Sequence, residues 1–139
     1  MEELDNYLLL CLRFNAYFIN QKIAKVAEKA KLGISQFNLL HLLYCNGTIK
    51  ATELRYWLPN GPGYIDSLIL QMVERGYIQR LRSPKDKRVI QVRLTHEGMH
   101  IVDSLIDEYE KGILDSFAIL DEDDKYNLIH LLKKLGRGL

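Results

Sequence analysis

Positive charge is concentrated in one short segment of the sequence, residues 76–94. The segment reads GYIQRLRSPKDKRVIQVRL, and beside the single acid Asp86 it carries six bases, Arg80, Arg82, Lys85, Lys87, Arg88 and Arg93. Six bases and one acid give +5, whereas the whole chain carries +1, which leaves −4 on all other residues. A basic surface on an otherwise acidic body is typical of proteins that contact a polyanion. The alternative is a solvated hairpin edge kept soluble by its charges.

Asp86 and Arg88 are two residues apart at the predicted tip of this hairpin. A carboxylate at this spacing can accept hydrogen bonds from a guanidinium and orient it, because the two planar groups pair well. The neighbouring bases would meet phosphate groups, contacts that add affinity and salt dependence more than sequence information. The residues expected to do so are Arg82, Lys85, Lys87 and Arg88. Any one of them alone is better explained as a solvated surface charge, but the cluster is not.

Length and composition limit the class of protein. A chain of 139 residues fits one folding unit, and 47% hydrophobic with 27% charged residues is a globular composition. The first residues carry acids where a secretory signal would carry bases, and no apolar run approaches the roughly 20 residues that a membrane helix needs. We therefore expect a cytoplasmic protein without a membrane segment.

No arrangement typical of an enzyme active site is present. The sequence has no Ser/His/Asp ordering, no phosphate-binding glycine loop and no convincing carboxylate pair, so we expect neither catalysis nor a cofactor. His96 and His100 are spaced to share a helix face, but zinc needs further ligands, so solvated histidines are the preferred interpretation and no metal is expected. Cys11 and Cys45 suit neither a metal pair nor a disulfide framework, which favours free thiols.

Helical spacing of apolar residues predicts a long helix from Glu3 to about Lys31. A strongly hydrophobic second helix should follow, with Ser35 as N-cap, and should end near Asn46-Gly47. A brief strand at 48–50 then precedes a two-turn helix over 51–58.

The turn at 60–63 predicts the start of a third helix, which carries one buried stripe and ends at Gly76. The stripe consists of Ile65, Leu68, Ile69, Met72 and Val73. Strands at 77–78 and 89–94 should flank the polar tip at 83–87. Thr95 and Asp121 are the expected N-caps of two final helices.

Helix, turn, helix and a two-stranded ribbon, in this order, predict a winged helix-turn-helix. The fold class is thus mainly α with a small β-hairpin (α+β), in one domain, 1–139. We expect a winged lobe over 35–95, flanked by a helical dimerisation region over 1–34 and 96–139. The flanking helices are too long and too apolar for so small a lobe to cover, so we expect a homodimer. It would match half-sites about 34 Å apart on a pseudo-palindromic duplex.

A wing pattern of an arginine, then Asp-x-Arg, then Leu-Thr-x-x-Gly is met by Arg82, Asp86, Arg88, Leu94, Thr95 and Gly98. With Glu53-Leu54 and the MVERGY segment at 72–77, this makes the sequence resemble the MarR family of bacterial and archaeal transcriptional regulators. The resemblance covers essentially the whole chain. It implies a DNA-binding regulator, expected to repress by excluding polymerase.

The resemblance makes the helix from residue 62 the recognition helix. Its outward face offers Tyr64, Ser67 and Gln71 and no base before Arg75, and Asp66 stands beside Ser67 where relatives carry Ser or Thr and then Arg. Gln71 suits adenine, Ser67 suits either base, and Tyr64 suits a phosphate or a thymine methyl. Equally open is that Tyr64 covers the turn and nothing here reads bases. The alternative function is a winged-helix module that binds a protein.

The resemblance also implies a small aromatic effector bound between the dimerisation helices and the winged lobe. The candidate contacts are Phe14, Tyr17, Phe37 and Trp57, although aromatic residues at helical spacing more often belong to the core.

Cys11 lies roughly where hydroperoxide-sensing relatives keep a reactive cysteine. Asn15 stands where those relatives have a tyrosine, so Cys11 is better interpreted as a small apolar residue on a packed face.

Overall fold

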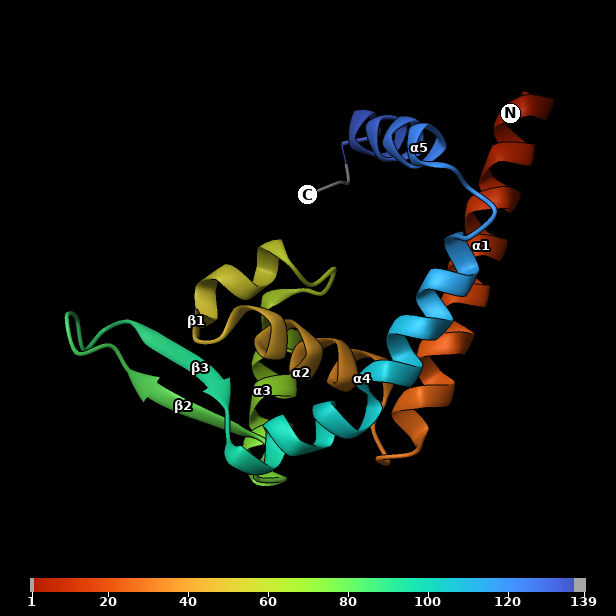
Figure 1. The fold of residues 1–139 in the computed structure, drawn as a ribbon. Helices are drawn as coiled ribbons and strands as arrows, with labels where there is room; N and C mark the ends of the chain where they lie inside the picture. The colour runs from red at the N-terminus through yellow and green to blue at the C-terminus, as the bar shows by residue number, and fades with distance from the viewer. Residues whose placement is uncertain (1, 137–139) are drawn as a thin grey trace.

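Within residues 2–136, which the computed structural model describes, the chain forms five α-helices, one 3₁₀ helix and three strands (Figure 1). In chain order they are α1 (Glu3–Glu28), α2 (Ile34–Asn46), β1 (Ile49–Lys50), η1 (Ala51–Tyr56), α3 (Pro62–Glu74), β2 (Ile78–Arg82), β3 (Ile90–Leu94), α4 (His96–Phe117) and α5 (Glu122–Lys134). The predicted fold class, mainly α with a small β-hairpin, is confirmed.

The strands form one antiparallel sheet in the order β1-β3-β2. β3 lies in the middle, where Val92 is opposite Ile49 of β1 and Arg80 of β2. Val92 is fully buried and Ile49 nearly so, which explains why the short β1 joins the ribbon. The prediction of a two-stranded ribbon was therefore incomplete. The hairpin β2–β3 projects from the helical body as the wing (Figure 1).

The hydrophobic core lies within the winged lobe and between it and the adjoining parts of α1 and α4. Every buried apolar residue in the described chain falls between Ile23 and Leu105, with α2 at the centre. Phe37, Leu39 and Leu40 are completely buried, and each large side chain removed from water in this way contributes about 1.5–3 kcal/mol. The predicted stripe of α3 is confirmed for its buried members Ile65, Leu68, Ile69 and Met72.

Two predicted helix boundaries were wrong. α1 ends at Glu28, before Lys31, whose positive φ of 56° turns the chain. α2 begins at Ile34 with Gly33, not Ser35, at the N-cap position. The reason is Gln36, whose side-chain Oε1 accepts a hydrogen bond from the backbone N–H of Gly33 at 3.0 Å. This bond stabilises a first helical turn whose N-cap lies two residues before the predicted N-cap Ser35.

Two further segments differ from the prediction. Residues 51–56 form a 3₁₀ helix and not a two-turn α-helix over 51–58, with Leu54 as its fully buried residue. The second strand extends over Ile78–Arg82 and not over residues 77–78 alone, because backbone pairing with β3 continues up to the pair Arg82 and Ile90.

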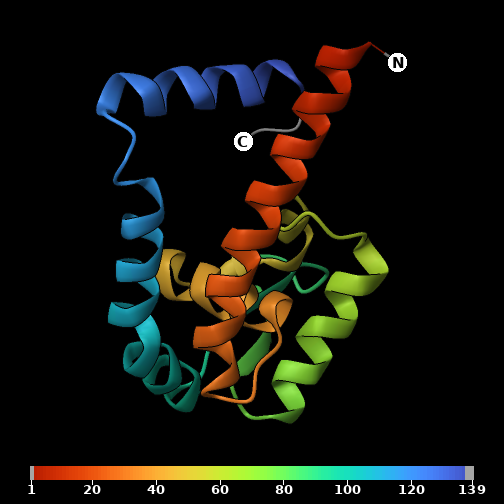
Figure 2. The ribbon, with the colours of Figure 1, turned by 90° about the vertical axis from the view of Figure 1, so that its right-hand side faces the viewer.

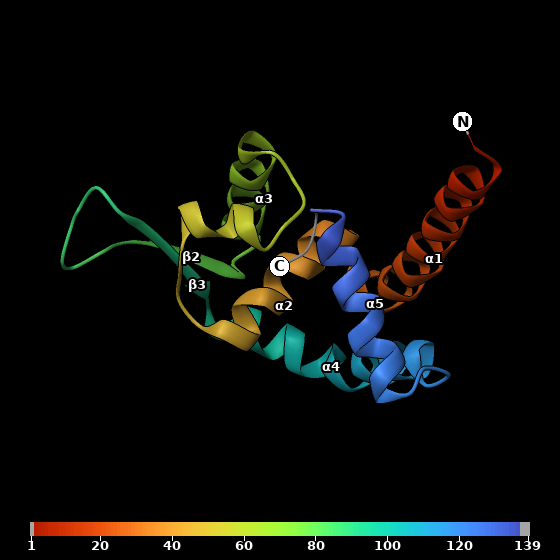
Figure 3. The same cartoon turned by 90° about the horizontal axis from the view of Figure 1, so that it is seen from above.

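The two predicted N-caps of the last helices are confirmed. The Thr95 side chain accepts a hydrogen bond from the Gly98 N–H at 3.1 Å, and Asp121 accepts one from the Asp124 N–H at 2.8 Å. α5 follows α4 after a short turn and stands above the winged lobe (Figure 2), and none of its residues is buried. Seen from above, the wing tip and the start of α1 lie at opposite ends of the molecule (Figure 3).

Candidate nucleic-acid interface

Helix α3 exposes one polar face beside the wing. Its N-cap is Gly61 and its first residue is Pro62, which suits a first turn because its missing N–H would have no helical partner. The buried stripe anchors the helix on the core. Tyr64, Ser67 and Gln71 therefore lie on the exposed side, with Tyr64 50% exposed.

Two of these predicted residues contact each other. Gln71 Nε2 donates to Ser67 Oγ at 3.3 Å, and Gln71 Oε1 accepts from Gln36 Nε2 of α2 at 2.9 Å. Gln36 was not predicted to be part of the site, because its only signal in the sequence is its position three residues after Gly33.

Arg75, the first base after the recognition face, turns away from that face. Its guanidinium donates to the carbonyl oxygens of Lys31 at 2.8 Å and Ala30 at 3.1 Å, and it lies 5.2 Å above the Tyr77 ring. It therefore caps the chain leaving α1. The exposed face of α3 thus has no base of its own, and it carries the acids Asp66 and Glu74.

The wing tip brings Asp86 and Arg88 together, the pairing expected from their spacing. The Arg88 guanidinium donates to both carboxylate oxygens of Asp86 at 3.2 Å, and the Arg88 backbone N–H donates to Asp86 Oδ1 at 3.0 Å. The Arg88 side chain, and then its N–H, lower the pKa of Asp86. The Arg88 side chain remains 91% exposed, so its outer edge faces solvent.

The other tip residues are ordered by backbone contacts. Arg82 Nη1 donates to the Lys87 carbonyl at 3.1 Å, across the base of the tip. The N–H of the buried Ser83 donates to the Val89 carbonyl at 2.9 Å, and Ser83 Oγ accepts from the Lys85 N–H at 3.3 Å. These contacts hold Arg82, at the end of β2, and Lys85 and Lys87 of the following loop together at one exposed tip.

The wing is fixed to α4 through the Leu-Thr-x-x-Gly segment. Thr95 donates its hydroxyl to the Gly76 carbonyl at 2.5 Å, and its N–H donates to the Tyr77 carbonyl at 3.0 Å. A Cβ on Gly98 would lie 2.2 Å from the same Tyr77 oxygen. Only glycine lets the start of α4 come this close to the Tyr77 carbonyl, which explains why the motif ends in glycine.

The four predicted effector contacts do not surround one cavity. Phe37 is completely buried and packs on the rings of His41 and Tyr109, with centroids 6.0 and 5.1 Å away. Phe14 and Tyr17 are each 56% exposed on the first half of α1, and Trp57 is 47% exposed after η1.

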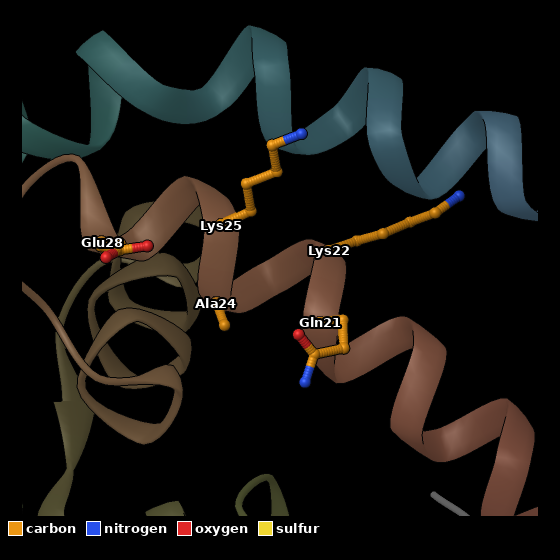
Figure 4. Close-up of a pocket in the computed structure, with 5 residues that line it drawn as sticks. All are labelled: Gln21, Lys22, Ala24, Lys25 and Glu28. Carbon is orange, nitrogen blue, oxygen red and sulfur yellow. The ribbon is translucent and has the colours of Figure 1, made fainter.

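An open hollow of about 350 Å³ lies along α1, and Lys22 and Lys25 of its lining point toward α4 (Figure 4). Its lining contains no aromatic residue and consists of Gln21, Lys22, Ala24, Lys25 and Glu28. Lys22 reaches across to α4 and donates to Ser116 Oγ at 2.6 Å.

The histidines and cysteines do not gather into a metal site. Within residues 2–136, no three His, Cys, Asp or Glu side chains lie close enough together to hold a metal ion. Both cysteines are free thiols, and Cys45 Sγ lies 3.5 Å from His41 Nε2. Burial lowers the pKa of His41, and Glu110 opposes this shift. In the same part of the chain, no helix combines the length and apolar character needed to cross a membrane.

Comparison with known proteins relates this geometry to one family. The model of the MarR family matches residues 32–90, from just before α2 to the first residue of β3. The chain is 31% identical over 102 residues to the uncharacterized HTH-type transcriptional regulator YkoM of Bacillus subtilis, an alignment that covers 73% of this chain and 66% of YkoM.

Two solved structures show the same fold. A mutant MarR from E. coli complexed with operator DNA superposes with a TM-score of 0.79 at 22% identity and covers 97% of this chain and 99% of that chain. Bordetella bronchiseptica BpsR, whose DNA binding is regulated by 6-hydroxynicotinic acid, gives a TM-score of 0.77 at 19% identity and covers 94% of this chain and 98% of that chain.

Proposed function

The chain belongs to the MarR family of transcriptional regulators, and on that premise we propose that it is a homodimeric repressor that binds double-stranded DNA. It would act by occupying a pseudo-palindromic site and excluding polymerase. The family consists of regulators and not enzymes.

The ordered, basic wing tip is the single observation that carries DNA binding. The tip carries four bases, Arg82 at the end of β2 and Lys85, Lys87 and Arg88 in the loop that follows, and hydrogen bonds order both parts. Asp86 neutralises only part of this charge and orients the Arg88 fork, whose outer edge is free for a phosphate. Positive charge on a rigid projection next to an exposed helix suits contact with the DNA backbone while the helix enters the major groove.

Helix α3 would supply base contacts through Ser67 and Gln71, with Tyr64 near the backbone. These side chains can read base edges, but the helix adds no positive charge. Most of the electrostatic attraction must therefore come from the wing.

The homodimer is supported by apolar side chains that the single chain leaves uncovered. The exposed large residues of α5 are Tyr126, Leu128, Ile129, Leu131 and Leu132. On the first half of α1, Leu4, Tyr7 and Leu8 are also exposed. Surfaces of this kind are normally buried against a partner, and a second copy with the same exposed helices would provide one.

A small aromatic effector remains part of the proposal. About half of the surface of Phe14, Tyr17 and Trp57 is accessible, whereas Phe37 is completely buried and could not contact a ligand in this conformation. Their placement favours a site completed by the second copy, since α1 leaves the first two open.

The salt dependence of DNA binding tests the function. Fluorescence anisotropy with genomic duplex fragments should show log K falling steeply with log salt concentration. Replacing Arg82, Lys85, Lys87 and Arg88 by alanine should reduce the slope by about 4 per protomer, at about 1 per phosphate contact. Run-off transcription from the retained fragments should fall when the protein is added.

A charge-matched variant separates a wing contact from a general charge effect. Lys111, Lys125, Lys133 and Lys134 are exposed on α4 and α5, and their replacement by alanine removes the same charge away from the wing. This variant should keep the wild-type slope. Absence of duplex binding even at low salt would instead favour the protein-interaction module, which the acids Asp66 and Glu74 on α3 suit.

A further inference from the structure

Three hydrogen bonds connect the turn before α2 to the exposed face of α3. The Gly33 N–H donates to Gln36 Oε1 at 3.0 Å, and Gln36 Nε2 donates to Gln71 Oε1 at 2.9 Å. Gln71 Nε2 then donates to Ser67 Oγ at 3.3 Å. A residue of one helix thus holds the side chain of a residue predicted to read DNA on the next.

The backbone N–H at the start of this series fixes the direction of every bond in it. A backbone N–H can only donate, so the oxygen of the Gln36 amide must face Gly33. Its nitrogen then faces Gln71, which must present its own oxygen in return. The Gln71 amide nitrogen is left pointing toward Ser67. Turning either amide over would break at least one of the three bonds.

This orientation leaves hydrogen-bond donors on the exposed face. The carbonyl oxygen of Gln71 is engaged by Gln36, whereas its amide nitrogen has a second N–H free. Ser67 Oγ accepts from Gln71, so its hydroxyl proton is free to donate elsewhere. Two donors match guanine, which shows the two acceptors N7 and O6 in the major groove. Adenine shows one acceptor and one donor, and reading both needs an outward-facing oxygen on Gln71.

We propose that Gln36 is a positioning residue that sets base specificity by turning Gln71 to favour guanine over adenine. The proposal rests on the proposed function, in which α3 enters the major groove. It replaces the expectation from sequence that Gln71 pairs with adenine. Gln36 itself touches no base in this arrangement and acts through Gln71 alone.

The substitution Gln36→Glu is designed to reverse the orientation without disturbing the fold. A carboxylate still accepts the Gly33 N–H, and an acid in the first turn of α2 interacts favourably with the helix dipole. The second carboxylate oxygen offers Gln71 an acceptor where the wild type offers a donor. Gln71 must then present its amide nitrogen to α2 and its oxygen outward. An oxygen and a free N–H on the outward side suit adenine.

Selection from a randomised duplex library, followed by sequencing of the retained DNA, measures the effect. The full-length wild type should favour guanine over adenine at one position per half-site, and Gln71→Ala should level that position. Gln36→Glu should shift the guanine-to-adenine ratio there toward adenine by about tenfold. The double variant Gln36→Glu/Gln71→Ala should show the same base preference as Gln71→Ala alone, because Gln36 acts through Gln71.

A control variant accounts for the added negative charge. Asn38→Asp introduces the same charge on α2 two residues away and should retain the wild-type base preference. Thermal unfolding midpoints that match among the variants would show that base preference, and not folding, has changed.

The possible failures can be told apart. An unchanged ratio in Gln36→Glu, at a position that Gln71→Ala levels, would overturn the positioning role while leaving DNA binding intact. A wild type and a Gln71→Ala variant with identical preferences at every position would overturn it too. Retention of no duplex by the wild type would remove the proposed function, and the positioning role with it.

Discussion

The winged lobe and the helical arms bury their apolar residues to very different extents. We define the arms as residues 3–18 of α1 together with residues 114–135. Between Ile23 and Leu105 the chain builds a closed core, with residues such as Phe37 and Val102 completely buried. In the arms no residue is buried, and Leu4 and Ile119 are 74% and 89% exposed. The lobe therefore builds a buried core within one chain, whereas the arms do not.

The two ends of α4 show this difference within one helix. Its first half buries Gly98, Val102 and Leu105, and its second half exposes Leu114 at 66%. Tyr109 and Ile113 in the second half still pack against the core, but only as partly buried residues. Helices in proteins gain most of their stability from packing, so the exposed side of this half favours a further contact surface. The comparison supports the proposal that the arms pack against a second copy of the chain, whereas the core of the lobe is complete within one chain.

The largest expected effect comes from charging an arm. Leu128→Asp with Leu131→Asp should convert the proposed dimer into monomers, because two leucines that are exposed in the single chain could no longer be buried against a second copy. Each leucine contributes about 1.5–3 kcal/mol, so the dissociation constant should rise by roughly 100-fold or more. Sedimentation velocity over a range of concentrations measures this change.

Met99→Asp is the matched control for that experiment. Met99 is also an exposed apolar side chain, 42% accessible, but it belongs to the lobe end of α4. The variant should sediment as the wild type does. If both variants stayed dimeric, the arms would not be the interface, and their exposed apolar residues would need another explanation.

The second prediction places a methyl group in each half of α4. Gly98→Ala should lower the free energy of unfolding by about 3 kcal/mol, because the new Cβ would press on the Tyr77 backbone, which cannot give way as a flexible side chain can. Gly112→Ala, in open space, should raise it by about 1 kcal/mol through helix propensity. Urea unfolding at one protomer concentration measures both. Equal effects at the two positions would contradict the close fit of the wing on α4.

Local signals explain which elements were predictable from sequence. The stripe of α3 and the caps Thr95 and Asp121 act within one helix, and all three were predicted. Strand β2 was too short in the prediction because only Ile78 of its five residues is buried. Its remaining residues become a strand through pairing with β3, and a single sequence carries no apolar pattern that reports such pairing.

The contacts of the candidate site also divide into local ones, which were predictable, and long-range ones, which were not. Asp86 and Arg88 are two residues apart, so their contact follows from spacing. Gln36 and Gln71 are 35 residues apart, and their hydrogen bond depends on how α2 packs beside α3. Arg75 likewise contacts Lys31 from 44 residues away. Contacts of this kind are set by the packing of the core, which residue type and local spacing do not reveal.

Arg75 provides a smaller test of how the lobe holds the end of α1. Arg75→Ala should reduce the free energy of unfolding by about 1 kcal/mol, since it removes two charge-assisted bonds to the carbonyls of Ala30 and Lys31. Arg75→Lys should restore part of the loss, because an ammonium lacks the fork that reaches both oxygens. Hydrogen exchange at residues 29–32 should quicken in the alanine variant. Unchanged exchange there would show that the cap contributes nothing to the junction.

The smallest effect concerns the wing tip, which lies outside both the core and the arms. The Arg88 side chain and N–H lower the pKa of Asp86, so a carbon-detected NMR titration should place its midpoint below the ordinary value of about 3.9. Because the folded-state pKa is lowered, the contribution of this pair is fully present above that ordinary value. It is lost only as the pH falls through the lower, folded-state pKa.

Arg88→Ala should raise the Asp86 midpoint only part of the way, because the backbone N–H of residue 88 still donates. Arg93→Ala should leave the midpoint unchanged, since Arg93 pairs with Gln79 across the strands at 3.1 Å. Both variants should unfold at the wild-type urea concentration near neutral pH, because exposed pairs add little to global stability. A lower unfolding midpoint for Arg88→Ala would mean that the tip is coupled to the core and is not an independent projection.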